Sequence, residues 1–186
     1  MKITKKAAVV YSLRGLKHGG WAEVTIREWN KGGSFSCQSD FGDFNYIWGS
    51  IGVQTLREFL CDLNKGYFMK KTRQGRYMEF DFDKTIEQIK TDILTVRRDE
   101  GITKQEALDS WEEVEKLYIE SGESQDAFFY SISNMCPVLY ELYNDGRLND
   151  EYHPSIRERY TSGCDGFWDN MWPHFVEYWK EELKND

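Results

Sequence analysis

The sequence has 186 residues, of which 40% are hydrophobic and 16% aromatic, as in folded globular proteins and unlike disordered ones. No apolar run approaches the roughly 18–20 residues of a membrane-spanning helix. The basic N-terminal segment has too short an apolar stretch for a signal peptide. We therefore expect a cytoplasmic protein with reduced cysteines.

The net charge of −8 is unevenly distributed along the chain. Residues 1–98 contain 17 Lys/Arg and 11 Asp/Glu, a balance of +6, whereas residues 99–186 contain 7 and 21, a balance of −14. Such asymmetry points to partners rather than to a fold. We expect the acidic half to attract basic protein surfaces, with solvated charged faces as the alternative.

The first part of the chain predicts an antiparallel sheet. Residues 21–29 alternate with period two, as in a half-buried strand, and the turn at residues 30–33 follows. Further short strands are expected at residues 7–13, 35–39 and 44–48. A helix is predicted over residues 53–63 from its apolar spacing. Two short strands, 67–71 and 76–80, should surround Gln74 and Gly75.

The second part of the chain predicts helices. Asp83 is the expected N-cap of a helix that ends at Arg98, and a capping box of Thr103 and Glu106 starts the next one, which reaches about Glu120. The two should form an antiparallel hairpin. Pro137 should break a helical segment at residues 124–144. An irregular connection at 146–166 then leads to a final helix at 170–183.

These elements predict an α+β fold, in which a sheet of three to four strands packs on helices and an acidic helical half follows. No long linker interrupts the sequence, so we expect a single domain over residues 1–186 with one shared core. Residues 1–81 should be mainly sheet with one helix, and residues 82–186 mainly helical.

The sequence contains no motif that identifies a catalytic, cofactor or metal site. We predict no cofactor, no metal and no catalytic residue, and we favour a non-enzymatic role over an enzymatic one. A small metal-dependent hydrolase or nuclease using Glu79, Asp81 and Asp83 stays as an alternative. His153 is read as a surface histidine, and Cys164 as a structural cysteine.

Three groups of residues are candidates for partner binding. The first is an acidic face made of Glu112, Glu113, Glu115 and Glu120. The second is an aromatic helix carrying Trp168, Trp172 and Trp179, which either docks on the fold or forms a partner or homodimer face. The third supports direct nucleic-acid binding as a less favoured alternative, and comprises Lys65, Lys70, Lys71, Arg73 and Arg76.

A second line of evidence on function is the resemblance of one part of the sequence to a known type of protein. The turn Ser39-Asp40-Phe41-Gly42 is followed by Tyr46, Trp48, Gly49 and Gly52, and then by Phe59-Leu60 within a helix. Over residues 21–120 the chain thereby resembles small accessory proteins encoded by bacteriophages and prophages. The resemblance implies the cytoplasm of an infected bacterium and inhibition of a host protein. We expect the host protein to be a defence complex that handles nucleic acid, like the targets of anti-CRISPR proteins. The resemblance implies no catalytic residue.

Overall fold

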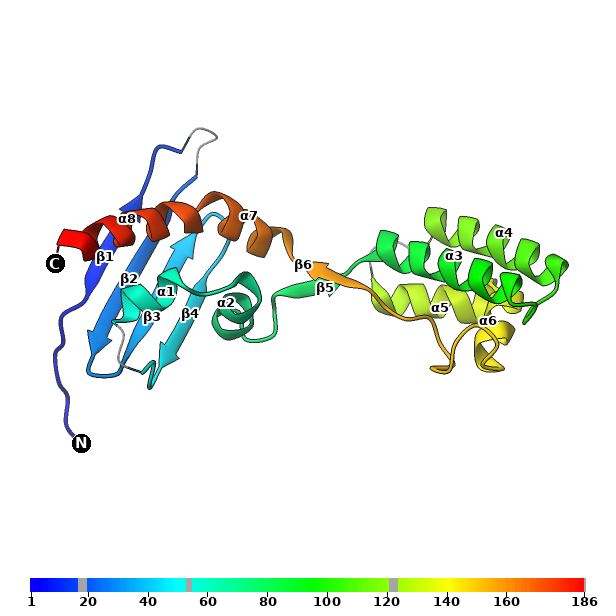
Figure 1. Ribbon diagram of the computed structural model, residues 1–186, viewed down its shortest axis with the longest axis horizontal. Helices are drawn as coiled ribbons and strands as arrows, with labels where there is room; N and C mark the ends of the chain where they lie inside the picture. The colour runs from blue at the N-terminus through cyan, green and yellow to red at the C-terminus, as the bar shows by residue number, and fades with distance from the viewer. Residues whose placement is uncertain (17–19, 53–54, 121–123, 186) are drawn as a thin grey trace. The chain divides into compact units, whose positions relative to one another are not determined.

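The computed structural model describes residues 1–16, 20–52, 55–120 and 124–185, without the side chains of residues 118–120. The chain divides into two compact units. We call Met1–Met78 with Tyr160–Asp186 the sheet unit, and Glu79–Arg159 the helical unit. The helical unit is therefore an insertion within the sequence of the sheet unit (Figure 1).

The sheet unit contains a four-stranded antiparallel meander, as predicted. Its strands follow each other in the order β1-β2-β3-β4. Their bounds are β1 Val9–Leu13, β2 Ala22–Trp29, β3 Gly32–Ser39 and β4 Phe44–Trp48. Phe35 pairs with Tyr46, and Cys37 with Phe44, so these side chains lie on one face. The alternating sequence thus gives the sheet a buried and a solvent-facing side.

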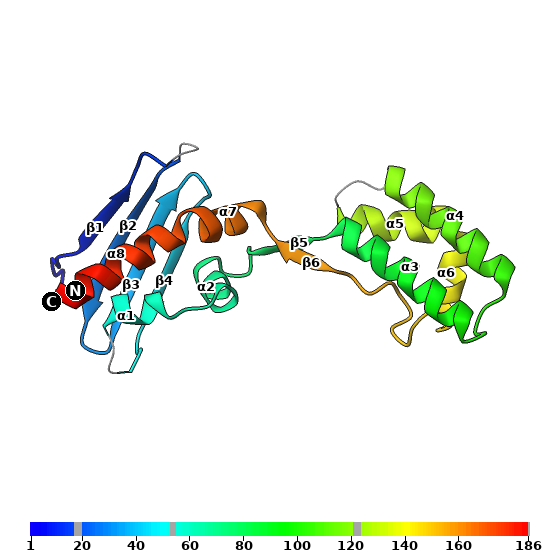
Figure 2. The same ribbon diagram turned by 45° about the horizontal axis from the view of Figure 1, so that its top comes forward.

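Helices cover the buried face of the sheet, and Figures 1 and 2 both show α8 running across it. The helices of this unit are α1 Leu56–Cys61, α2 Lys65–Thr72, α7 Ser162–Asn170 and α8 Trp172–Asn185. The predicted strand at 67–71 is wrong, because this segment lies in α2. Asn64 caps α2, accepting a hydrogen bond from the Tyr67 amide at 2.9 Å, and the helix buries Phe68 and Met69.

The described part of the helical unit contains four helices, α3 Phe82–Arg98, α4 Lys104–Glu120, α5 Gln125–Met135 and α6 Pro137–Asn144. The expected hairpin of α3 and α4 is present, and Thr103 and Glu106 form the predicted capping box. The expected break at Pro137 is confirmed, since Pro137 begins α6. The N-cap of α3 is Asp81 and not Asp83, because the Asp81 carboxylate accepts from the Lys84 amide at 3.1 Å.

The segment predicted to be an irregular connection is partly regular. Strand β6, Glu158–Tyr160, pairs with β5, Met78–Phe80, and α7 begins at Ser162. The division between the two units falls within this short ladder. Through this pairing the chain returns from the helical unit to the sheet unit. The local sequence patterns did not predict the pairing.

The α+β class is confirmed, but the expected single shared core is wrong. One hydrophobic cluster combines the sheet with α1, α2, α7 and α8, and a second one lies among α3, α4, α5 and α6. Residues 160–186 thus pack with the N-terminal part of the chain. That residues 1–186 behave as one domain stays a prediction.

Charge follows the two units more closely than it follows the two halves of the sequence. The sheet unit contains 15 Lys/Arg and 12 Asp/Glu, a balance of +3, whereas the helical unit contains 9 and 20, a balance of −11. The acidic character of this protein therefore resides in the inserted unit.

Candidate functional site

The acidic face predicted on residues 112–120 lies on α4. Glu112 is exposed, and the side chain of Glu115 is 54% exposed. Glu113 points the other way and is only 8% exposed. The side chain of Glu120 lies outside the described part of the chain. The structure thus leaves Glu112 and Glu115 as the accessible acids of this set.

Glu113 holds two helices together inside the helical unit. Its carboxylate accepts hydrogen bonds from the backbone amides of Leu139 at 2.8 Å and Val138 at 3.2 Å. These amides belong to the first turn of α6, whose N-cap, Cys136, provides no capping side chain. A carboxylate at a helix N-terminus also interacts favourably with the helix dipole. Glu113 therefore has a structural role.

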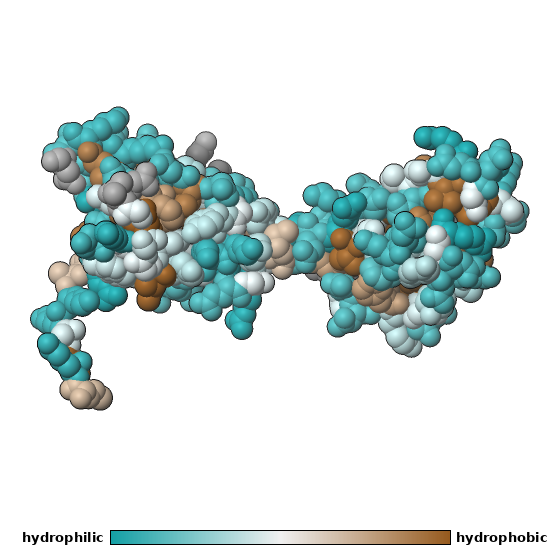
Figure 3. Space-filling model, turned by 60° about the horizontal axis from the view of Figure 1, so that its bottom comes forward, coloured by the Kyte–Doolittle hydropathy of each residue, from teal (hydrophilic) through white to brown (hydrophobic). Residues whose placement is uncertain are grey.

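The outer side of the α3–α4 hairpin combines acidic and apolar residues. Lys90 of α3 forms an ion pair with Glu115, and its ammonium group lies 5.1 Å from the ring centroid of Trp111. One turn away along each antiparallel helix are Leu94 and Leu108, which are 54% and 50% exposed. Figure 3 shows hydrophobic surface among hydrophilic residues on this unit. We call these five residues, together with the exposed Glu112 of α4, the hairpin face.

The predicted aromatic helix comprises residues of two helices, α7 and α8, and packs on the sheet. Trp172 and Trp179 are 3% and 0% exposed, and Trp168 is half-buried. Trp172 contacts Phe68 at a ring-centroid distance of 4.4 Å and stacks on Trp168 at 5.5 Å. This arrangement agrees with the docking alternative, in which the stripe of tryptophans attaches the C-terminal helices to the fold.

The five basic residues of the nucleic-acid alternative lie on α2 and the turn after it. Lys65 pairs with Asp165 at 2.6 Å, and Arg73 donates to the backbone oxygen of Asp43 at 2.8 Å. Lys71 lies over the rings of Tyr46 and Tyr67. The remaining two, Lys70 and Arg76, are exposed. Three of the five basic side chains thus make contacts within the sheet unit.

Comparison with known proteins places the chain in a family. The model of a phage protein family, described only as a phage family, matches residues 1–184. The chain belongs to this phage family. The resemblance found on residues 21–120 is thereby confirmed, and the match extends it to both ends. No curated protein and no solved structure matches the chain.

The alternative metal site of this phage protein is not assembled. Glu79 forms an ion pair with Arg159 at 2.9 Å, Asp81 is buried as the N-cap of α3, and Asp83 is exposed. Among the described residues, no group of three or more His, Cys, Asp or Glu side chains is arranged to hold a metal ion. None of the described helices has the length and apolar character needed to cross a lipid bilayer.

The two single residues considered from the sequence lie apart from these surfaces. His153 is exposed, and its Nδ1 lies 3.1 Å from the backbone oxygen of Pro154. Cys164 is buried in the sheet unit's core, in the first turn of α7. Both positions agree with the structural interpretations made from the sequence.

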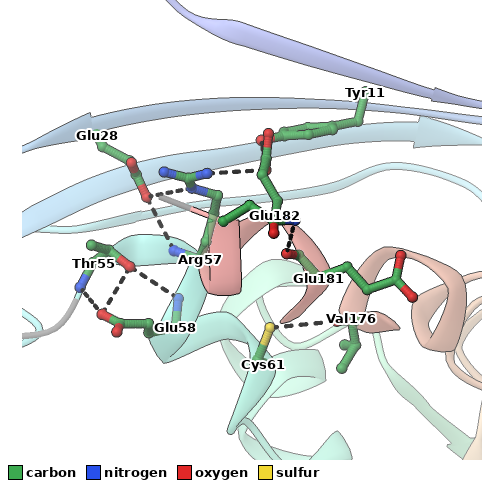
Figure 4. A network of polar contacts seen from close by, with 10 residues as sticks. Tyr11, Glu28, Thr55, Arg57, Glu58, Cys61, Val176, Glu181 and Glu182 are labelled. Carbon is green, nitrogen blue, oxygen red and sulfur yellow. Dashed lines mark hydrogen bonds and ion pairs between the residues drawn. The ribbon is translucent and has the colours of Figure 1, made fainter. Parts of the chain in front are cut away.

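A polar network in the sheet unit of the phage protein was missed by sequence reasoning. Glu182 of α8 accepts from the Tyr11 hydroxyl and pairs with Arg57, both at 3.0 Å (Figure 4). Arg57 also pairs with Glu28 at 3.6 Å. Burial and the neighbouring Glu182 raise the pKa of Tyr11 to about 12. The partners are as many as 171 residues apart in sequence, so no local spacing could have indicated them.

Proposed function

We propose that this phage protein binds a host protein in the bacterial cytoplasm, through the acidic helical unit, and inhibits it. The observation that carries the proposal is the charge balance of −11 on the helical unit. An acidic surface with exposed leucines complements a basic surface that also has apolar contacts. Proteins that handle nucleic acid have basic surfaces of this kind.

The hairpin face provides the features that a protein interface needs. Leu94 and Leu108 add apolar area that water does not favour, and the exposed Glu112 provides negative charge beside it, whereas Glu115 already pairs with Lys90. A target with a groove for nucleic acid, such as a defence complex, would be blocked by an acidic protein bound there. The family membership supports the phage setting of this proposal.

The test is capture of partners from a bacterial lysate by the tagged full chain, with and without nuclease, read by mass spectrometry. We expect a stoichiometric protein partner that survives nuclease. Partners that disappear with nuclease would favour direct nucleic-acid binding by the sheet unit instead, which would weaken steeply with added salt.

A matched pair of double variants then locates the surface. The variant Glu112→Lys/Glu115→Lys should lose the partner by charge reversal on the hairpin face. The control Asp62→Lys/Asp165→Lys makes the same change of net charge in the sheet unit, where Asp165 pairs with Lys65 as Glu115 pairs with Lys90, and should keep the partner. Equal retention by both variants would refute binding through the hairpin face.

A further inference from the structure

Strand β1 lies at one edge of the sheet, and no charged residue or proline within the strand itself protects that edge. Its sequence, Val-Val-Tyr-Ser-Leu, contains no charged residue and no proline. Val9 and Val10 are both 54% exposed. A strand edge of this kind readily pairs with another strand, because its outward backbone groups form hydrogen bonds only with water or a new partner.

Helix α8, which covers the sheet next to this edge, also has exposed residues there. A hollow of about 300 Å³ is lined by residues 10–13 of β1 and by His174, Phe175 and Tyr178 of α8. The Tyr178 ring lies 5.8 Å from that of Tyr11 and is part of a side chain that is 54% exposed. Apolar surface thus continues from the strand edge to the covering helix.

The opposite edge of the sheet differs. Strand β4 carries Ile47, which is 61% exposed, but the ammonium group of Lys71 lies 5.3 Å from the Tyr46 ring centroid on the same strand. A lysine beside an edge strand is a common protection against pairing, because its charge would have to be desolvated. The two edges are therefore distinguishable by experiment.

We infer that two copies of this chain associate through antiparallel pairing of their β1 strands, giving a continuous sheet of eight strands. A molecule that covers this surface must pair a strand with β1 and pack a helix beside α8, because the exposed surface includes both the sheet edge and the covering helix. A second copy related by a two-fold axis offers both, at the matching spacing.

The charges agree with this register. With Tyr11 opposite Tyr11 of the second copy, Val9 faces Leu13 and Val10 faces Ser12. No charged side chain is therefore brought opposite another within the paired strands, where like charges would destabilise the pair. The Tyr178 ring lies 5.8 Å from that of Tyr11, so the same two-fold axis would bring the two Tyr178 side chains near each other, with His174 one turn before and Glu181 one turn after on each α8.

The test is sedimentation of the full chain over a range of concentrations. We expect a mass of twice 22.0 kDa. Val10→Lys on the strand and Tyr178→Lys on the helix should each raise the dissociation constant of the dimer at least about tenfold. Ile47→Lys, at a similarly exposed position on the other edge strand, should leave it unchanged. Because all three positions are exposed, circular dichroism should show an unchanged fold.

The possible outcomes separate clearly. Dissociation by the first two variants but not by Ile47→Lys supports the inference. A monomer at every concentration would overturn it, as would a dimer that tolerates Val10→Lys and Tyr178→Lys or is dissociated by Ile47→Lys. None of these results depends on finding a host partner.

Discussion

Replacing Glu113 with alanine should destabilise the helical unit by about 2–4 kcal/mol. The substitution removes the acceptor of two backbone amides in α6, at 2.8 and 3.2 Å. An unsatisfied buried amide costs about 1–3 kcal/mol, and the Leu139 amide is buried whereas that of Val138 is partly buried. The variant also avoids the free-energy cost of burying the Glu113 carboxylate, and this gain offsets part of the lost stability.

The assay is urea unfolding of the full chain, followed by circular dichroism at helical wavelengths. The matched control is Glu112→Ala, which changes the neighbouring exposed residue and should shift stability by no more than about 0.5 kcal/mol. If Glu113→Ala and Glu112→Ala unfold at the same urea concentration, the capping role assigned to Glu113 is refuted.

The same experiment tests the prediction of a single domain. Six of the seven tryptophans belong to the sheet unit, and only Trp111 belongs to the helical unit, so tryptophan fluorescence reports mainly on the sheet. If the chain unfolds as one domain, Glu113→Ala should shift the fluorescence and circular dichroism transitions equally. A shift confined to circular dichroism would show that the two units unfold separately.

Two further predictions concern caps and titration. Asp81→Ala should cost about 1–2 kcal/mol, while Asp83→Ala should cost less than about 0.5 kcal/mol; equal losses in urea unfolding would contradict Asp81 as the N-cap of α3. The pKa of Tyr11 is raised from 10.0 to about 12, so its contribution to stability is complete below pH 10 and is lost as pH rises toward 12. Tyr11→Phe should therefore flatten the fall in melting temperature over this range, and the exposed Tyr130→Phe should not; identical profiles would argue against a Tyr11–Glu182 bond.

The elements that sequence patterns predicted well are those whose signal is local. The strand at 22–29 alternates strictly, and its core positions Val24 and Ile26 are almost fully buried. The capping box of Thr103 and Glu106 spans only four residues. In both cases the pattern and the structure depend on the same short stretch of chain.

The misassigned elements depend on partners that are distant in sequence. Residues 67–71 were expected to be a strand, yet they form part of α2, because Phe68 packs against Trp172 of the C-terminal segment. Glu113 was assigned to an exposed acidic face, yet it caps a helix that begins 24 residues later. Neither contact has a signature in the local sequence, since tertiary packing overrides propensity.

The two proposed surfaces lie in different units, which makes their combination testable. A dimer through β1 would present two acidic helical units, so an immobilised or oligomeric target would be held by avidity as well as by intrinsic affinity. Val10→Lys should then leave the affinity for a single soluble target unchanged while it speeds dissociation from a dense target surface. Equal dissociation of Val10→Lys and the unmodified chain from such a surface would show that pairing of β1 does not contribute to target binding. Loss of affinity for the single soluble target would instead show that the β1 edge belongs to the target interface itself.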